Sequence, residues 1–167
     1  MRKTWDGVRG SSIPHRTPQA VVAQLELTSQ ISFDVLLRSV EAAHGKPIAV
    51  RSVPGSTIPG LSGLWLETEF KSHILVPQDH SELHRRHVIC HELGHILLQH
   101  EGCDGLAASM PSVFNHVGQR KGIKRMLARS PQWNDVEKAA EEVAYLLSRI
   151  VLDKPTAPTS DFEKVFG

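Results

Sequence analysis

The sequence of 167 residues lacks any apolar run near the roughly 20 residues that a helix needs to cross a bilayer. The segment from Met1 to Pro18 is polar and has no apolar core of the kind found in signal peptides. Two cysteines, Cys90 and Cys103, are too few for a disulfide framework. The net charge of +1 gives no strong field toward nucleic acid or membranes. We therefore expect a cytoplasmic protein with free thiols, no membrane partner and no direct binding to nucleic acid.

Histidine, in contrast, is abundant. Seven of the ten histidines fall between positions 73 and 100, namely His73, His80, His84, His87, His91, His95 and His100. Imidazoles clustered in this way are typical of metal sites and of acid–base chemistry.

The length, with 40% hydrophobic and 22% charged residues, is that of one globular domain. We expect a flexible N-terminal segment over 1–19, one folded domain over 20–152 and a tail over 153–167. Apolar spacing predicts helices over 19–27, 32–44, 81–99, 119–129 and 130–152, and strands over 46–53, 64–70 and 72–76. The last two strands are expected to pair as a hairpin. The predicted fold class is α+β, with a small twisted sheet packed on helices.

Capping residues predict where the two longest helices begin and end. Asp79 or Ser81 can cap the start of the helix over 81–99, and Gly102 can end it. Ser130 and Pro131 offer a cap followed by proline at the first position of the last helix.

The helix over 81–99 contains His91-Glu92-Leu93-Gly94-His95, a motif of the form H-E-x-x-H. Positions i and i+4 lie one above the other, so the two imidazoles can reach one tetrahedral zinc ion. Glu92 is rotated by about 100° from His91 and can take a proton from the attacking water as the catalytic base. Gly94 would let another backbone approach closely. The alternative is a pair of buried histidines beside a helix ion pair.

A catalytic zinc site needs a third protein ligand, and no third histidine follows at the H-x-x-G-x-x-H spacing. The last helix offers Glu137, Glu141 and Glu142 instead. We predict Glu137 as the metal ligand and Glu141, one turn later, as the hydrogen-bond partner of a motif histidine, with Glu142 turned away. Glu137 could instead belong to a capping box begun by Asn134, in which case Glu141 becomes the ligand.

Other polar residues have weaker claims to a role in the site. His87 is one turn before His91 and is expected to pack or to orient the site. His100 is expected on the surface, because it lies off the face of the two motif histidines. Three residues could supply a donor that steadies the oxyanion, namely Tyr145, His73 and His116, and their spacing does not choose among them.

Two further segments have expected roles at the surface. A basic run within 118–130 is expected to be a solvated helix face, and the alternative is a docking surface for an acidic partner or for DNA bound by a substrate protein. One of the strands 64–69 and 73–76 is expected to border the cleft, where an extended substrate could add by main-chain pairing.

Over roughly residues 30–150 the sequence resembles the ImmA/IrrE family of bacterial metallopeptidases, which are gluzincin-like. The most specific likeness runs from Arg85 to His100, an arginine-preceded H-E-L-G-H helix with trailing leucines and a histidine. The second runs from Glu137 to Leu147, in which Glu141 replaces the family's Asn or Asp and Val143 replaces an aromatic residue.

This resemblance implies a zinc-dependent endopeptidase that cleaves a helix-turn-helix transcriptional repressor. One alternative is a non-catalytic zinc-containing regulatory module, although a structural site would not need the base Glu92. The other alternative is a toxin-type protease whose substrate is unrelated to transcription.

Overall fold

The computed structural model describes residues 16–100, 123–128 and 135–152. Its elements are, in chain order, α1 (Pro18–Ala23), α2 (Phe33–His44), β1 (Ile48–Val53), the 3-10 helix η1 (Gly55–Thr57), β2 (Leu64–Thr68), β3 (Ser72–Pro77), α3 (Glu82–Leu98), β4 (Ile123–Ala128) and α4 (Asp135–Leu152). Residues 1–15 and 153–167 lie outside the described ranges, so the division into domain, lead-in and tail stays a prediction.

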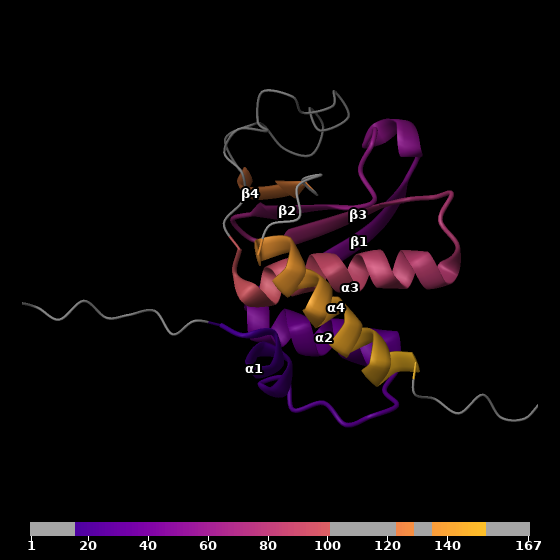
Figure 1. Ribbon diagram of the computed structural model, residues 1–167. Helices are drawn as coiled ribbons and strands as arrows, with labels where there is room; N and C mark the ends of the chain where they lie inside the picture. The colour runs from indigo at the N-terminus through magenta and orange to yellow at the C-terminus, as the bar shows by residue number, and fades with distance from the viewer. Residues whose placement is uncertain (1–15, 101–122, 129–134, 153–167) are drawn as a thin grey trace, which may run out of the picture.

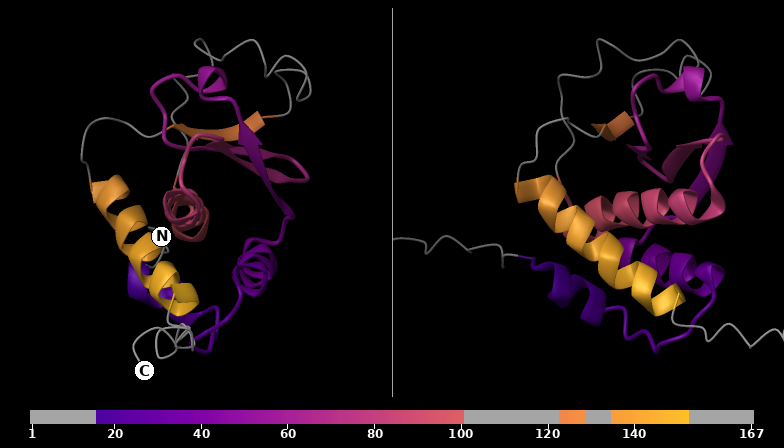
Figure 2. Two further views of the ribbon diagram at one scale, coloured as in Figure 1. Left: turned by 90° about the vertical axis from the view of Figure 1, so that its right-hand side faces the viewer. Right: turned by 45° about the vertical axis from the view of Figure 1, so that its right-hand side comes forward.

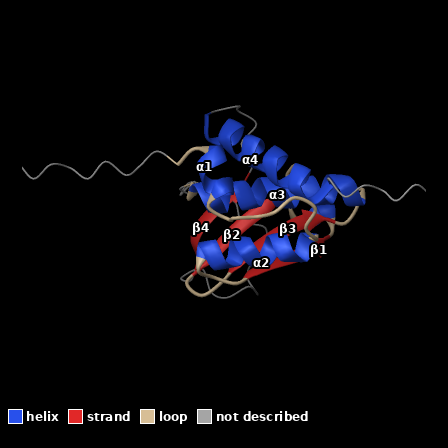
Figure 3. Ribbon diagram, turned by 90° about the horizontal axis from the view of Figure 1, so that it is seen from below, coloured by secondary structure: helices blue, strands red, loops and turns tan. Residues whose placement is uncertain are grey.

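The expected α+β fold is confirmed, with a sheet on one side and the four α-helices on the other (Figure 1, Figure 3). In the left view of Figure 2, α3 is seen end-on beneath the sheet, with α2 and α4 on either side of it. Helix α3 packs chiefly against α4 and also contacts β3, α1 and α2. This central position puts the H-E-x-x-H motif inside the molecule.

The four strands lie in the order β1-β3-β2-β4. Strands β2 and β3 form the expected antiparallel hairpin, and β1 runs parallel to β3. Since β2 and β3 both have neighbours on each side, neither is an edge strand to which a substrate could add. That prediction was wrong, and the edges of the described sheet are β1 and β4.

Strand β4 replaces part of the basic helix predicted over 119–129, and this prediction was also wrong. The backbone of β4 pairs antiparallel with β2, with Leu64 opposite Ala128 and Trp65 opposite Leu127. Pairing along an available sheet edge outweighs local helix propensity, because strand preference is set largely by context.

Apolar residues alternate along the strands and form a core on each face of the sheet. The larger core lies between the sheet and the helices and includes Trp65, Ile74, Leu36, Val40 and Leu93. The smaller core lies on the opposite face, where Ile58 of the loop before β2 packs with Leu64 and Leu66 of β2 and Leu75 of β3.

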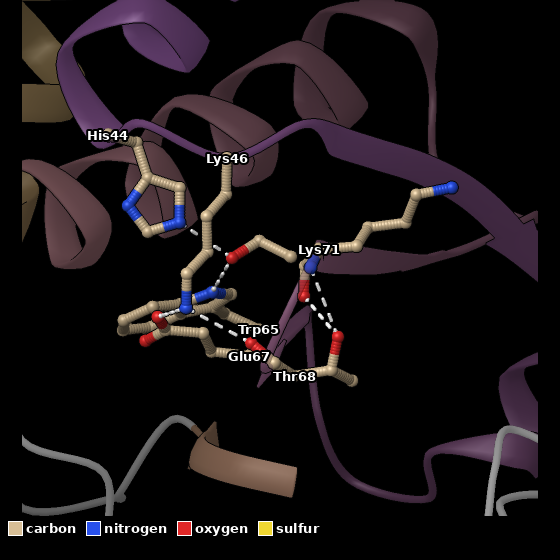
Figure 4. A network of polar contacts seen from close by, with 7 residues as sticks. His44, Lys46, Trp65, Glu67, Thr68 and Lys71 are labelled. Carbon is tan, nitrogen blue, oxygen red and sulfur yellow. Dashed lines mark hydrogen bonds and ion pairs between the residues drawn. The ribbon is translucent and has the colours of Figure 1, made fainter. Parts of the chain in front are cut away.

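A polar cluster ties the end of α2 to the β2–β3 hairpin (Figure 4). Lys46 forms an ion pair with Glu67, whose side chain is mostly buried. The indole N–H of Trp65 donates to Oγ of Ser72 at 3.2 Å, and His44 Nε2 lies 2.9 Å from the same oxygen. These contacts provide partners for the buried polar groups and give the cluster a structural role.

Helix α3 begins at the predicted cap but does not end at the predicted residue. Ser81 caps the helix, because its Oγ accepts a hydrogen bond from the backbone N–H of His84 at 3.3 Å. The helix ends at Gln99 in the left-handed conformation (φ 55°), and not at Gly102 as predicted. The predicted cap of the last helix, Ser130, lies outside the described residues, and α4 is described from Asp135.

Candidate metal centre

Helices α3 and α4 cross in close contact because one of them carries a glycine at the crossing. A Cβ atom added to Gly94 would lie 2.7 Å from the carbonyl oxygen of Ala140 and 3.2 Å from its Cα. No side chain larger than hydrogen fits between the two backbones, as the sequence predicted. The crossing brings the first turn of α4 next to the motif histidines.

Three buried side chains meet at this crossing, namely His91, His95 and Glu137. One potential ligand atom from each lies within 4.8 Å of the others. Nε2 of His91 lies 3.0 Å from Nε2 of His95 and 3.3 Å from Oε2 of Glu137. Nε2 of His95 lies 3.7 Å from Oε1 of Glu137.

These separations fit a tetrahedral metal site. Ligand atoms about 2 Å from a tetrahedral ion lie about 3.3 Å from one another. Two imidazole nitrogens and one carboxylate oxygen are also a donor set that zinc takes in catalytic sites, where a fourth position stays open. In chemistry and spacing, the residues present could therefore hold a divalent metal ion.

Glu141 lies behind the centre and contacts two histidines of α3. Its Oε2 is 3.0 Å from Nδ1 of His91, on the ring side opposite Glu137. Its Oε1 is 3.0 Å from Nε2 of His87. A carboxylate in this position fixes the orientation and the tautomer of His91, and His87 in turn holds the carboxylate.

His100 lies beside the centre and not on the open surface, so that prediction was wrong. Its Nδ1 is 2.9 Å from Nδ1 of His95. The left-handed Gln99 turns the chain back, and the N–H of His100 donates to the carbonyl of His95 at 3.1 Å. Extrapolating a regular helix to position 100 misses this turn, because a left-handed glutamine is uncommon.

Glu92 is buried, with 2% of its surface exposed, and a glycine of the loop before β2 lies against it. A Cβ atom added to Gly63 would lie 2.9 Å from Oε1 of Glu92 and 2.5 Å from Cγ1 of Val88. The loop can therefore close over the carboxylate only because residue 63 has no side chain. The sequence did not single out Gly63, since a glycine in a turn-rich loop has many possible reasons.

The two motif histidines differ in charge state. Burial and the neighbouring rings of His91 and His100 lower the pKa of His95 to about 2. Burial also acts to lower the pKa of His91, but the carboxylates of Glu137, Glu92 and Glu141 outweigh it and raise this pKa. His95 is thus a neutral imidazole at physiological pH, whereas the carboxylates around His91 favour its protonated form more than in a free histidine.

The candidate oxyanion donors are not brought to the centre in the described residues. Tyr145 is 60% exposed, and its ring lies 5.9 Å from the guanidinium carbon of Arg149. His73 pairs opposite Leu66, which belongs to the core on the sheet face away from α3. His116 lies outside the described ranges.

Two other residues behave as the sequence suggested. Glu142 is exposed and accepts a hydrogen bond from Gln19, so it faces away from the centre. Cys90 is a buried free thiol, and burial raises its pKa to about 11. It acts as a small apolar residue and not as a nucleophile.

An H-E-x-x-H helix beneath a small sheet, with a glutamate next to it on a following helix, defines the zincin-like class of metallopeptidases. Residues 48–115 match the family model described as Peptidase_M78, IrrE N-terminal-like domain. Over these residues the chain is similar to this metallopeptidase family, and the predicted resemblance to ImmA/IrrE is confirmed.

The matched segment contains β1, β2, β3 and α3 but ends before α4. Comparison with curated proteins and with solved structures gave no match. Among the described helices, none has the length and apolar character that crossing a membrane requires.

Proposed function

We propose that this protein is a zinc-dependent endopeptidase in which His91, His95 and Glu137 bind the metal and Glu92 is the catalytic base. The observation that carries the proposal is the meeting of these three ligand atoms within 4.8 Å, from two helices separated by more than thirty residues of chain. A buried carboxylate beside two imidazoles is costly unless a cation or proton compensates it.

A bound zinc ion would supply Lewis acidity, which polarises the peptide carbonyl and lowers the pKa of water. His95 offers a neutral imidazole, and Glu137 offers a negative charge that favours a divalent cation. Glu141 would accept a hydrogen bond from the Nδ1–H of His91, so that the lone pair of Nε2 would be available to the metal.

Glu92 carries the proton transfers of the reaction. It follows His91 directly on α3, so its carboxylate projects from a neighbouring face of the same helix turn. We assign it to accept the proton of the attacking water and to deliver that proton to the amine nitrogen when the peptide bond breaks. The loop at Gly63 covers it and keeps bulk water from the carboxylate.

The proposed substrate is a helix-turn-helix transcriptional repressor, cleaved in the cytoplasm. The resemblance to the ImmA/IrrE family supports this substrate class. A toxin-type protease would act on a different protein, so the purified chain should be incubated with helix-turn-helix repressors and with unrelated proteins in parallel. Cleavage restricted to the unrelated proteins would reject the repressor.

The variant Glu92→Gln tests the catalytic assignment. It should retain metal at wild-type stoichiometry and lose at least about 100-fold in cleavage rate, since the base is gone while the ligands remain. Glu82→Gln, an exposed position in the first turn of the same helix, is the matched control and should leave both unchanged. Wild-type biological activity in Glu92→Gln would instead favour a non-catalytic binding module.

The variant Glu137→Gln tests the ligand assignment. Its affinity for zinc should fall by more than about 100-fold, because loss of a direct ligand exceeds the 10–100-fold typical of outer partners. Glu142→Gln is the control on the same helix, one residue from Glu141 and facing away. Unchanged zinc affinity in Glu137→Gln would remove Glu137 from the ligand set and make Glu141 the candidate.

A further inference from the structure

A hollow of about 400 Å³ opens between the first half of α3, the end of α4 and the start of α2. In Figure 2, α3 runs between α2 and α4. Residues of all three helices line the hollow. Its size is in the range of small-molecule sites. The proposed peptidase chemistry does not use it.

The walls of the hollow are mostly apolar. Phe33 comes from α2, Leu83 from α3 and Val151 from α4. Leu83 leaves 63% of its surface exposed, which is high for a large apolar side chain at the mouth of a hollow. An apolar body seated there would cover Leu83 and be stabilised by the area removed from water.

Three polar side chains of the hollow are potential cations, namely Arg86, His84 and His87, and two are serines, Ser81 and Ser148. No acidic residue is among the described wall residues. Arg86 donates through Nε to Glu82 at 2.8 Å, while its terminal nitrogens make no hydrogen bond to any described residue. A guanidinium with free terminal N–H groups beside two imidazoles is suited to a carboxylate.

We propose that this hollow is a binding site for a small amphipathic carboxylate, with a phenyl or short alkyl body and a single negative charge. The apolar body lies against Phe33, Leu83 and Val151, and the carboxylate accepts hydrogen bonds from Arg86. Charge complementarity selects this occupant over a neutral one, because Arg86, His84 and His87 line the described wall and no acidic residue does.

The test is a titration of the full chain with 4-phenylbutyrate and, in parallel, with its neutral amide, followed by NMR of the methyl groups of Leu83 and Val151. The protein is kept metal-free, so that the carboxylate cannot bind a metal and the outcome does not depend on the peptidase assignment. We expect saturable shifts of both methyls with the carboxylate and at least tenfold weaker binding of the amide.

Two pairs of variants sharpen the result. Arg86→Gln should weaken binding of the carboxylate about tenfold and abolish its preference over the amide, while the neighbouring Arg85→Gln should change neither. Leu83→Ala should weaken binding of both probes, while Phe70→Ala, an apolar side chain that is 79% exposed elsewhere, should not. The four positions are exposed or half-buried, so each variant should fold.

The proposal is overturned if the two probes bind equally, if Arg86→Gln and Arg85→Gln behave alike, or if neither methyl shifts. It is also overturned if Leu83→Asp converts a dimer into a monomer in light scattering. That result would show that a second copy of the chain occupies the hollow.

Discussion

Partners on both sides of its ring hold His95 in place. Nε2 faces Glu137, and Nδ1 lies 2.9 Å from Nδ1 of His100. If Nε2 held a metal, Nδ1 would carry the proton and donate a hydrogen bond to Nδ1 of His100, which would fix both the tautomer and the ring orientation of His95.

We therefore predict that His100→Ala lowers the zinc affinity by about 10–100-fold, measured by competition with a chromogenic chelator. His100→Asn should recover part of the loss, because its carbonyl oxygen can accept the same hydrogen bond. His80→Ala, a half-buried histidine outside the centre, is the control. Equal affinities of His100→Ala and the wild type would reduce His100 to a packing role.

At this scale, the sequence predicted what regular helix geometry determines. His91 and His95 share a face because they are four positions apart, and the same periodicity separated Glu137 and Glu141 from Glu142. The sequence could not predict that His100 lies beside His95, because this position depends on the left-handed conformation of Gln99. Nor could it predict Gly63, whose importance arises only when a loop folds over Glu92.

Among the elements, the contact between α3 and α4 determines whether the metal ligands meet. Intrinsic propensity alone would favour replacing Gly94 by alanine, by about 1 kcal/mol in a helix interior. The structure predicts instead that Gly94→Ala is destabilising, since the added Cβ would lie 2.7 Å from the carbonyl oxygen of Ala140. The clash involves backbone on both sides, so a side-chain rotation cannot relieve it.

We predict that Gly94→Ala lowers the free energy of unfolding by roughly 1–3 kcal/mol, as overpacked cores do, when measured in urea. It should also weaken zinc binding, because α4 must move and takes Glu137 with it. Arg38→Ala, on an exposed helix position, serves as the control and should stay within about 0.5 kcal/mol of the wild type. A stabilised Gly94→Ala protein would contradict the close crossing.

The elements best predicted from sequence are those whose pattern is local. The hairpin of β2 and β3 and the helices α2 and α3 follow from apolar spacing and from caps such as Ser81. Strand β4 was missed because its conformation is set by β2, a partner more than fifty residues earlier in the chain. The end of α3 was missed because Gln99, and not a glycine, takes the left-handed conformation.

For the whole molecule, we predict that the metal-free fold is most stable near pH 6.5, the ordinary pKa of histidine. Burial lowers the pKa of His73, His95 and His100 in the folded protein. Below pH 6.5 the unfolded chain therefore binds more protons than the folded protein, and the free energy of unfolding decreases as the pH is lowered. Each such histidine contributes at most about 1.4 kcal/mol per pH unit. His91 acts oppositely, because the stability from its raised pKa is lost as pH rises through that pKa.

Urea unfolding between pH 5 and pH 8, with a chelator present, measures this dependence. His73→Gln should reduce the loss of unfolding free energy between pH 6.5 and pH 5, since glutamine has no proton to gain on unfolding. The decrease in the free energy of unfolding above pH 6.5 should be the same as in the wild type, because His91 is still present. Stability that rises steadily as pH falls from 6.5 to 5 would contradict the neutral state of the buried histidines.

Glu141 contacts one histidine of the hollow and one of the metal centre, and this links the proposed ligand to the proposed metal. His87 lines the hollow and lies 3.0 Å from Oε1 of Glu141, while Oε2 of the same carboxylate lies 3.0 Å from Nδ1 of His91. A carboxylate ligand that draws His87 toward the hollow leaves Glu141 with His91 alone. The stronger hydrogen bond makes His91 a more basic ligand.

We therefore expect saturating 4-phenylbutyrate to tighten zinc binding by about fivefold or more, the lower end of ordinary coupling between sites. Zinc must then tighten binding of 4-phenylbutyrate by the same factor, because coupling of equilibrium affinities is reciprocal. His87→Gln should bring both factors close to one, since it weakens the link without removing a metal ligand. Direct binding of the probe to zinc would add the same gain in wild type and in His87→Gln, so equal gains in the two proteins would contradict a link through Glu141.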